Sequence, residues 1–224
     1  MSIERIGPVV RTRLNNGLTV LVRENHNAPV VAIQIWVDVG SADEKDSQRG
    51  LAHFHEHMLF KGTKQRAVGE IAKAIEGAGG DINAWTSFDH TVYHVVLASR
   101  FTDLGLEVLL DTVTNPVFDA QEIEREKKVV LEEIKQTRDL PERWISDLLF
   151  SQVYQVHPYR YPILGTEKSV SSITRKKLTT FFRQHYVPGN MTLLVSGDIK
   201  TKNVLRKLGK LFSSKQAAAK KVQA

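Results

Sequence analysis

GLAHFHEHMLFKGT, residues 50–63, is the stretch around which the chain is organised. Within it, His53, Glu56 and His57 form the pattern H-x-x-E-H, with the two histidines four residues apart. Residues at this spacing share one face of a helix, so both imidazoles can bind the same ion. The glutamate is then left to act on a water molecule at that ion. The pattern predicts a helix that carries the zinc site of a hydrolase.

The motif contains a second possible histidine pair and does not establish a metal site by itself. His55 and His57 are only two residues apart and point to different faces of a helix, so His53 is the better partner of His57. The opposite helix face is expected to be buried through the apolar side chains of Leu51, Phe54, Leu59 and Phe60.

Composition narrows the class of protein. The chain has 224 residues, of which 42% are hydrophobic, so it can form a sizeable core. It has no cysteine, which excludes disulfides and thiolate ligands and leaves histidine and carboxylate ligands for a metal. The sequence MSIERIGPVV at the start has no apolar segment, and no apolar run reaches membrane-spanning length. We expect a cytoplasmic protein with no membrane partner.

The formal charge of +6 is concentrated at the end of the chain. From Lys200 onward there are eight Lys or Arg residues and no acidic residue, so residues 1–199 hold 23 basic and 25 acidic side chains. Nucleic-acid binding requires a basic surface on the folded body, and this body has a net charge of −2. We therefore expect no nucleic-acid partner.

Periodicity predicts both strands and helices. Residues 30–39 alternate and are rich in β-branched side chains, as in a central strand, and hairpins are predicted at Asn16-Gly17 and between residues 81–87 and 91–98. Helices are predicted over residues 68–75, 101–114, 119–138, 141–149 and 202–211. Asp119 and Glu122 are expected to form a capping box, and Ser172 is expected to cap a helix that ends at Phe182.

These elements mix hairpins with helices without strict alternation. The sequence therefore predicts an α+β fold of two layers, with helices packed on a mostly antiparallel sheet. Residues 1–212 are expected to form one domain. Residues 213–224, SSKQAAAKKVQA, are expected to be a basic, alanine-rich tail or linker.

A catalytic zinc site needs a third protein ligand. The remaining histidines are interpreted as surface or satisfied core residues. Glu126 and Glu133 are better candidates, because they are seven residues apart and stack on one face of a predicted helix. That helix also carries Glu122, Glu124 and Glu132, so the spacing alone leaves open a solvated acidic face.

The chain resembles the N-terminal domain of the pitrilysin, insulysin and mitochondrial processing peptidase family, the inverzincins. The resemblance extends over nearly the whole length and in the same order: Asn16-Gly17-Leu18, Trp36 with Gly40-Ser41, residues 50–63, Asn83-Ala84 with Thr86, residues 126–133, Gly165-Thr166, residues 186–190 and Gly197-Asp198. The separation of 76 positions between His57 and Glu133 also fits the spacing of this family.

The resemblance implies a role for each motif residue. His53, His57 and Glu133 would bind one Zn²⁺ per site, Glu56 would be the general base, and Glu126 would support the site electrostatically. Asn83 and Ala84 correspond to an exposed strand edge to which an extended peptide adds as a further strand. Without the resemblance, the segment is interpreted as an ordinary strand with Asn83 at a turn.

The predicted function is a zinc-dependent metalloendopeptidase domain that hydrolyses extended peptides. Family members usually consist of two such halves that close over the substrate, so this chain is expected to be one half. It is then either a short subunit that needs a homodimeric or heteromeric partner to supply the second half, or a piece of a longer protein. The alternative is a non-catalytic substrate-binding or assembly subunit of the same family, and a metal-dependent enzyme acting on small molecules is a third possibility.

Overall fold

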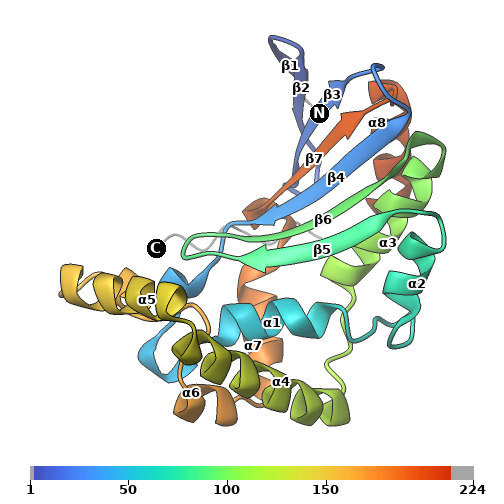
Figure 1. Ribbon diagram of the computed structural model, residues 1–224. Helices are drawn as coiled ribbons and strands as arrows, with labels where there is room; N and C mark the ends of the chain where they lie inside the picture. The colour runs from blue at the N-terminus through green and yellow to red at the C-terminus, as the bar shows by residue number, and fades with distance from the viewer. Residues whose placement is uncertain (1–2, 213–224) are drawn as a thin grey trace.

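The computed structural model describes residues 3–212, which form one seven-stranded sheet with helices packed against it (Figure 1). Its strands lie in the order β1-β2-β3-β7-β4-β6-β5. Only β3 and β7 pair in parallel, and the other neighbours are antiparallel. The strands are β1 (Ile3–Ile6), β2 (Val9–Arg13), β3 (Thr19–Glu24), β4 (Val30–Val37), β5 (Asp81–Thr86), β6 (Thr91–Ala98) and β7 (Met191–Gly197).

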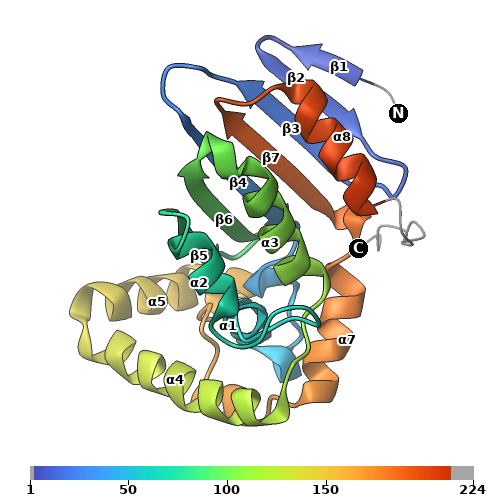
Figure 2. The same ribbon diagram turned by 90° about the vertical axis from the view of Figure 1, so that its right-hand side faces the viewer.

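The helices lie on one face of the sheet and beyond its β5 edge (Figures 1 and 2). α3 packs on β4 and β6, α8 packs on β3, and α1 lies beside β5. The α+β prediction is therefore confirmed. The helices are α1 (Leu51–Leu59), α2 (Glu70–Glu76), α3 (Thr102–Thr114), α4 (Ala120–Asp139), α5 (Pro141–Val153), α6 (Glu167–Ser171), α7 (Arg175–His185) and α8 (Thr201–Phe212).

The central strand β4 shows why the sequence forms this sheet. Its residues alternate between the helical layer and the open face, and Val31, Ile33 and Ile35 are at most 1% exposed. Branched side chains fill the space beneath the helices, whereas Gln34 and Trp36 lie on the other face and share a hydrogen bond of 2.9 Å from the indole Nε1 to the amide Oε1. The predicted central strand is confirmed.

The helix cap predicted at Ser172 needs correction. Ser172 has helical backbone angles and ends α6, a helix that was not predicted. Thr174 is extended, as an N-cap requires, and its hydroxyl accepts from the Lys177 backbone N–H, so α7 begins there and ends at His185. The helical conformation is interrupted between α6 and α7, where the Ile173 side chain enters the core.

At the start of α4, Asp119 accepts from the backbone N–H groups of Gln121 and Glu122, as an N-cap should. The Glu122 side chain pairs with Arg125 instead of completing the predicted capping box. Strand β1 was also not predicted. It pairs with β2 through a turn at Gly7, whose φ of +60° suits glycine.

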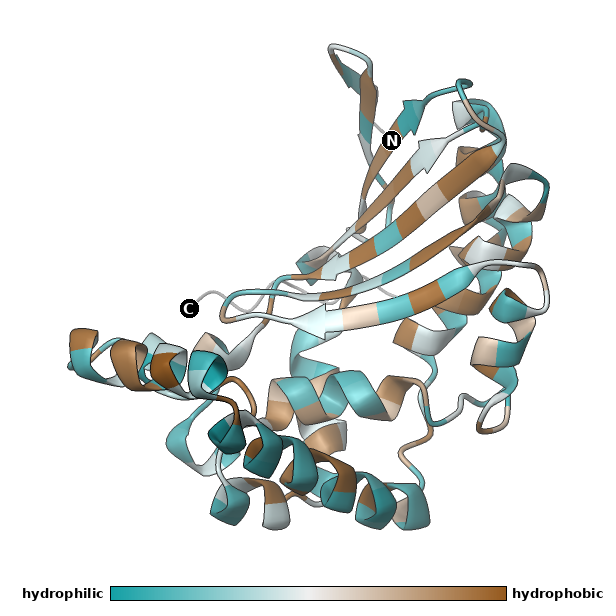
Figure 3. Cartoon of the chain, in the orientation of Figure 1, coloured by the Kyte–Doolittle hydropathy of each residue, from teal (hydrophilic) through white to brown (hydrophobic). Residues whose placement is uncertain are grey.

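α5 differs from the other long helices because none of its residues is buried. It packs on α4 at the margin of the molecule, and hydrophobic residues recur along its ribbon (Figure 3). Among residues 3–212, no helix is both long enough and apolar enough to cross a bilayer. The tail predicted at residues 213–224 lies outside the described residues.

Candidate metal centre

The helix that carries the H-x-x-E-H motif begins at Gly50, which lies in the left-handed region with φ of +85°. A Cβ at this position would approach the Leu164 carbonyl oxygen to 2.5 Å, so glycine is required for both angle and space. The buried carboxylate of Glu44 accepts from the backbone N–H groups of Gly50 at 2.8 Å and Ala52 at 2.6 Å. A side chain from the preceding loop thus caps α1 and fixes its direction.

His53 and His57 lie on the face of α1 that is turned toward α4. Their Nε2 atoms are 3.2 Å apart, and their side chains are 14% and 17% exposed. The opposite face packs Leu51, Phe54 and Met58 into the core, where each is fully buried. The amphipathic pattern therefore places both imidazoles at one point of a rigid helix.

Glu133 reaches the same point from α4. Its Oε2 atom is 3.8 Å from His53 Nε2 and 3.7 Å from His57 Nε2. The three side chains form the one group of potential metal ligands found within residues 3–212, with ligand atoms within 4.8 Å of one another. The fold therefore brings together residues 76 positions apart in the sequence.

These three residues fit a zinc ion. Tetrahedral zinc with ligands at 2.0–2.1 Å places its ligand atoms about 3.3 Å from each other, close to the observed separations. Glu133 Oε2 is buried and has no hydrogen-bond partner among the described residues, although it faces two imidazole nitrogens. A dication between the three atoms would satisfy all of them.

Glu126 lies two turns before Glu133 and holds His57 from the side. Its Oε1 atom is 2.8 Å from His57 Nδ1, and its Oε2 atom is 2.7 Å from the Lys61 ammonium. Burial alone would raise the pKa of Glu126, but the bonds to His57 and Lys61 outweigh it and hold the pKa below its usual range. An ionised carboxylate at Nδ1 favours the tautomer that leaves Nε2 free for a metal.

Glu56 directly precedes His57 on α1 and is 9% exposed. Its Oε2 atom accepts from the Thr86 hydroxyl at 2.5 Å. Burial raises the pKa of Glu56, the Thr86 hydrogen bond opposes that rise, and the charge of Glu133 adds to it. A carboxylate with a raised pKa beside a metal site suits a group that accepts and returns a proton.

Asn83 and Ala84 lie on β5, the strand at one edge of the sheet. Asn83 is exposed and Ala84 is partly buried. Thr86, which contacts Glu56, belongs to the same strand, so the candidate peptide-binding edge is joined directly to the candidate catalytic group. The structure thus places all seven predicted site residues on α1, α4 and the edge strand β5 beside them.

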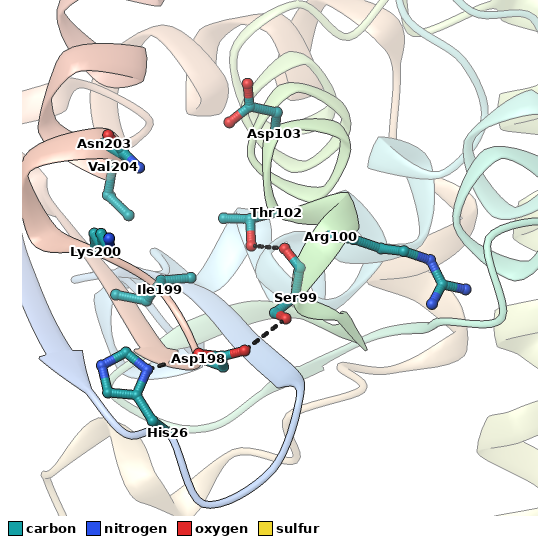
Figure 4. A pocket seen from close by; sticks show the side chains of 10 residues that line it. All are labelled: His26, Ser99, Arg100, Thr102, Asp103, Asp198, Ile199, Lys200, Asn203 and Val204. Atoms are coloured by element: carbon teal, nitrogen blue, oxygen red, sulfur yellow. Dashed lines mark hydrogen bonds and ion pairs between the residues drawn. The ribbon is translucent and has the colours of Figure 1, made fainter.

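His55 lies outside this group although it belongs to the same motif. Its ring is buried among Phe118, Phe182 and Tyr186, with centroids 4.3 to 5.8 Å apart. His26 is exposed and lies in a surface pocket at the other end of the sheet. Its Nδ1 is 2.6 Å from Asp198 Oδ1 (Figure 4).

Sequence reasoning missed three residues that support the site: Glu44, Lys61 and Thr86. Glu44 and Thr86 contact α1, Lys61 contacts Glu126, and none of the three has a ligand-type spacing of its own. Lys61 and Thr86 lie inside the motif stretches quoted above, which was the available signal.

Comparison with known proteins agrees with this geometry. The sequence model of the family described as "Insulinase (Peptidase family M16)" matches residues 19–167. A second model, described as "Peptidase M16 inactive domain", matches residues 172–224. The first match contains both histidines of the candidate metal centre and its three glutamates, Glu56, Glu126 and Glu133.

Individual relatives extend the likeness. An "Uncharacterized zinc protease" of Rickettsia felis is 37% identical over 91% of this chain and 49% of its own length. A "Probable mitochondrial-processing peptidase subunit beta" of Arabidopsis thaliana is 36% identical over 90% of this chain and 38% of its own. The crystal structure of a protease from Helicobacter pylori has a TM-score of 0.91 and 30% identity, covering 96% of this chain and 52% of that one.

The chain thus spans about half the length, or less, of the curated relatives it matches. Its fold is that of one half of such a peptidase. With a family match over residues 19–167 and relatives named as zinc proteases, the chain belongs to the insulinase family of peptidases, M16.

Proposed function

We propose that residues 1–212 form the zinc-binding half of a metalloendopeptidase. The observation that carries this proposal is the convergence of two imidazole nitrogens and an unpaired carboxylate oxygen beside Glu56. Relatives named as zinc proteases support the choice of metal. One Zn²⁺ would be held by His53, His57 and Glu133.

Each side chain then has a defined task. When bound, the ion would make a water molecule more acidic and polarise a scissile carbonyl group. The Glu56 carboxylate accepts the proton of the attacking water and returns it to the leaving amine. Thr86 donates a hydrogen bond to Oε2 of Glu56, which leaves Oε1 to accept the proton. Glu126 fixes the ring of His57.

The substrate proposed for this site is an extended peptide. The outer side of β5 has no neighbouring strand within the described part of the chain, so its backbone groups are available for pairing. A peptide that pairs beside Asn83 and Ala84 gains main-chain hydrogen bonds with little demand on its sequence. The Thr86 contact with Glu56 makes this edge continuous with the metal centre.

We further propose that full activity needs a second half, whether from a longer polypeptide that includes this sequence, from a second copy or from a different chain. Relatives of about twice the length support this view. So does α5, because exposed apolar side chains gathered on one helix usually mark an interface. Its exposed side chains, 46% to 64% accessible, are Trp144, Ile145, Leu148, Leu149 and Val153. Strong peptidase activity from a chain shown by mass measurement to be monomeric would contradict this part.

The decisive test compares the parent chain with Glu56→Gln, using Glu132→Gln on the exposed side of α4 as a matched control. We expect all three to hold zinc by metal analysis. In a fluorogenic peptide assay, Glu56→Gln should lose about 10²–10⁴-fold of the chelator-sensitive rate, since general acid–base catalysis contributes about that much. Glu132→Gln should keep the parental rate.

A zinc-loaded Glu56→Gln variant that cleaves at the parental rate would refute the role of Glu56. A parent that holds zinc but shows no chelator-sensitive hydrolysis, alone or with a second half, would instead indicate the non-catalytic subunit.

A further inference from the structure

Lys61 follows α1 in the sequence and contacts Glu126, the carboxylate that is bonded to His57. The Lys61 ammonium is 2.7 Å from Glu126 Oε2, while the other oxygen of that carboxylate is 2.8 Å from His57 Nδ1. We propose that Lys61 is a positioning residue, which locks the Glu126 carboxylate and thereby aims His57 Nε2 at the metal. The proposal rests on the zinc function above.

The backbone around Lys61 is fixed at both ends, so the ammonium has a defined origin. The Lys61 N–H donates to the Met58 carbonyl at 3.1 Å, which continues the last turn of α1. Gly62 follows with φ of +105° and accepts from the Val117 N–H at 3.3 Å, so the turn is fastened to the segment that leads into α4. Lys61 therefore lies beside the hydrogen bond that connects the end of α1 to the segment before α4.

Glu126 needs two partners because it is so well buried. Its side chain is only 5% exposed, and a buried carboxylate is stable when both oxygens are bonded. With Lys61 on one oxygen and His57 on the other, the carboxylate cannot rotate away from the imidazole. His53 has no such anchor, since its Nδ1 has no partner among the described residues. The orientation of the histidine pair therefore depends on Lys61, Glu126 and His57.

A positioning role and a purely electrostatic role for Lys61 predict changes of opposite sign in the affinity for zinc. If Lys61 acted only as a nearby positive charge, removing it would tighten the binding of a dication, because the repulsion would be lost. If Lys61 positions the ring, removing it weakens binding, because groups that orient a ligand are typically worth about 10–100-fold in metal affinity. The sign of the change distinguishes the two roles.

The test measures zinc affinity of the 224-residue chain by competition with a chromophoric chelator. Lys61→Met should weaken binding by about tenfold, and Lys61→Arg should restore most of it because a guanidinium can hold the same oxygen. Lys127→Met is the matched control: Lys127 forms a pair of the same 2.7 Å length with Glu124 on α4 but does not touch the site. It should bind zinc like the parent.

Cobalt absorption gives a second measure, because its visible bands report ligand geometry directly. We expect Lys61→Met to change these bands and Lys127→Met to leave them unchanged. Circular dichroism checks folding, and Lys61→Gln replaces Lys61→Met if the latter is unfolded. Equal or tighter zinc binding by the folded Lys61 variant would overturn the proposal. Failure of the parent to bind zinc would instead overturn the proposed function, and this inference with it.

Discussion

Two clusters of histidine and carboxylate lie at opposite ends of this molecule and differ in what they leave unpaired. At one end, His26 is bonded to Asp198 at 2.6 Å and lies 3.6 Å from a Glu24 oxygen, with 56% of its side chain exposed (Figure 4). At the other end, His53 and His57 face Glu133 across a partly buried gap. Composition alone would not tell these clusters apart.

The difference lies in burial and pairing. In the exposed cluster, the hydrogen bond to Asp198 raises the pKa of His26, as expected of a simple ion pair. In the metal centre, burial lowers the pKa of His53 to about 3, so its ring stays neutral and available as a ligand, whereas at His57 burial is outweighed by the hydrogen bond to Glu126 and the pKa is raised. Glu133 Oε2 is left without a partner there. Three converging ligand atoms, one of them a buried oxygen without a partner, therefore distinguish a ligand site from a structural pair.

Alanine substitution should separate the two clusters most sharply. His53→Ala or His57→Ala removes one of three zinc ligands, and we expect zinc binding to fall by more than about 10³-fold at pH 7. His26→Ala should leave zinc affinity unchanged. Isothermal titration of the apo protein measures all three variants. Tight zinc binding by His57→Ala would contradict the ligand assignment.

A smaller loss of zinc affinity is expected when Glu126, which contacts the ligand His57, is changed. In Glu126→Gln, one amide cannot accept from both His57 and Lys61, since its nitrogen is itself a donor. Zinc affinity should therefore fall by about 10–100-fold. Asp198→Asn makes the same chemical change beside His26 and should have no effect on zinc. Equal affinities in the two variants would mean that Glu126 does not orient His57.

The sequence was sufficient for elements whose signal is local. β4 alternates cleanly because one face meets the helices, and α1 shows its two faces within nine residues. The boundary between α6 and α7 could not be predicted in this way. Ser172 and Thr174 are both good capping residues, and the choice depends on how Ile173 enters a core assembled from distant strands.

The same limit applies to the site. The spacing of His53 and His57 is a property of one helix, so the pair could be predicted directly. Glu133 could not be chosen by spacing, because α4 carries other glutamates on its surface and only the packing of α4 against α1 selects one. The Thr86 contact with Glu56 joins a strand to a helix, and no periodic pattern records it.

His55 allows a test of burial without ligand function. Both of its ring nitrogens lack a hydrogen-bond partner among the described residues, and the ring is fully buried. An unsatisfied buried polar group costs about 1–3 kcal/mol, while the lost aromatic contacts are worth about 0.5–1.5 kcal/mol. His55→Leu should therefore raise the free energy of unfolding by about 1 kcal/mol in urea denaturation and leave zinc affinity unchanged.

His94→Leu, at a partly exposed histidine beside Trp85, is the control for that substitution and should change stability by less than about 0.5 kcal/mol. Destabilisation by His55→Leu would show that its imidazole has a partner after all, such as an ordered water.

The smallest expected effect concerns the exposed cluster and depends on pH. The folded-state pKa of His26 is raised above its ordinary value of 6.5, first through the hydrogen bond to Asp198. The stabilisation is therefore fully present below pH 6.5 and is lost as the pH rises through the raised pKa. The melting temperature of the parent should fall relative to His26→Gln over this interval, by less in high salt because the pair is exposed. Parallel melting curves across that range would show that the bond to Asp198 does not stabilise the fold, and the clusters would then differ only in burial.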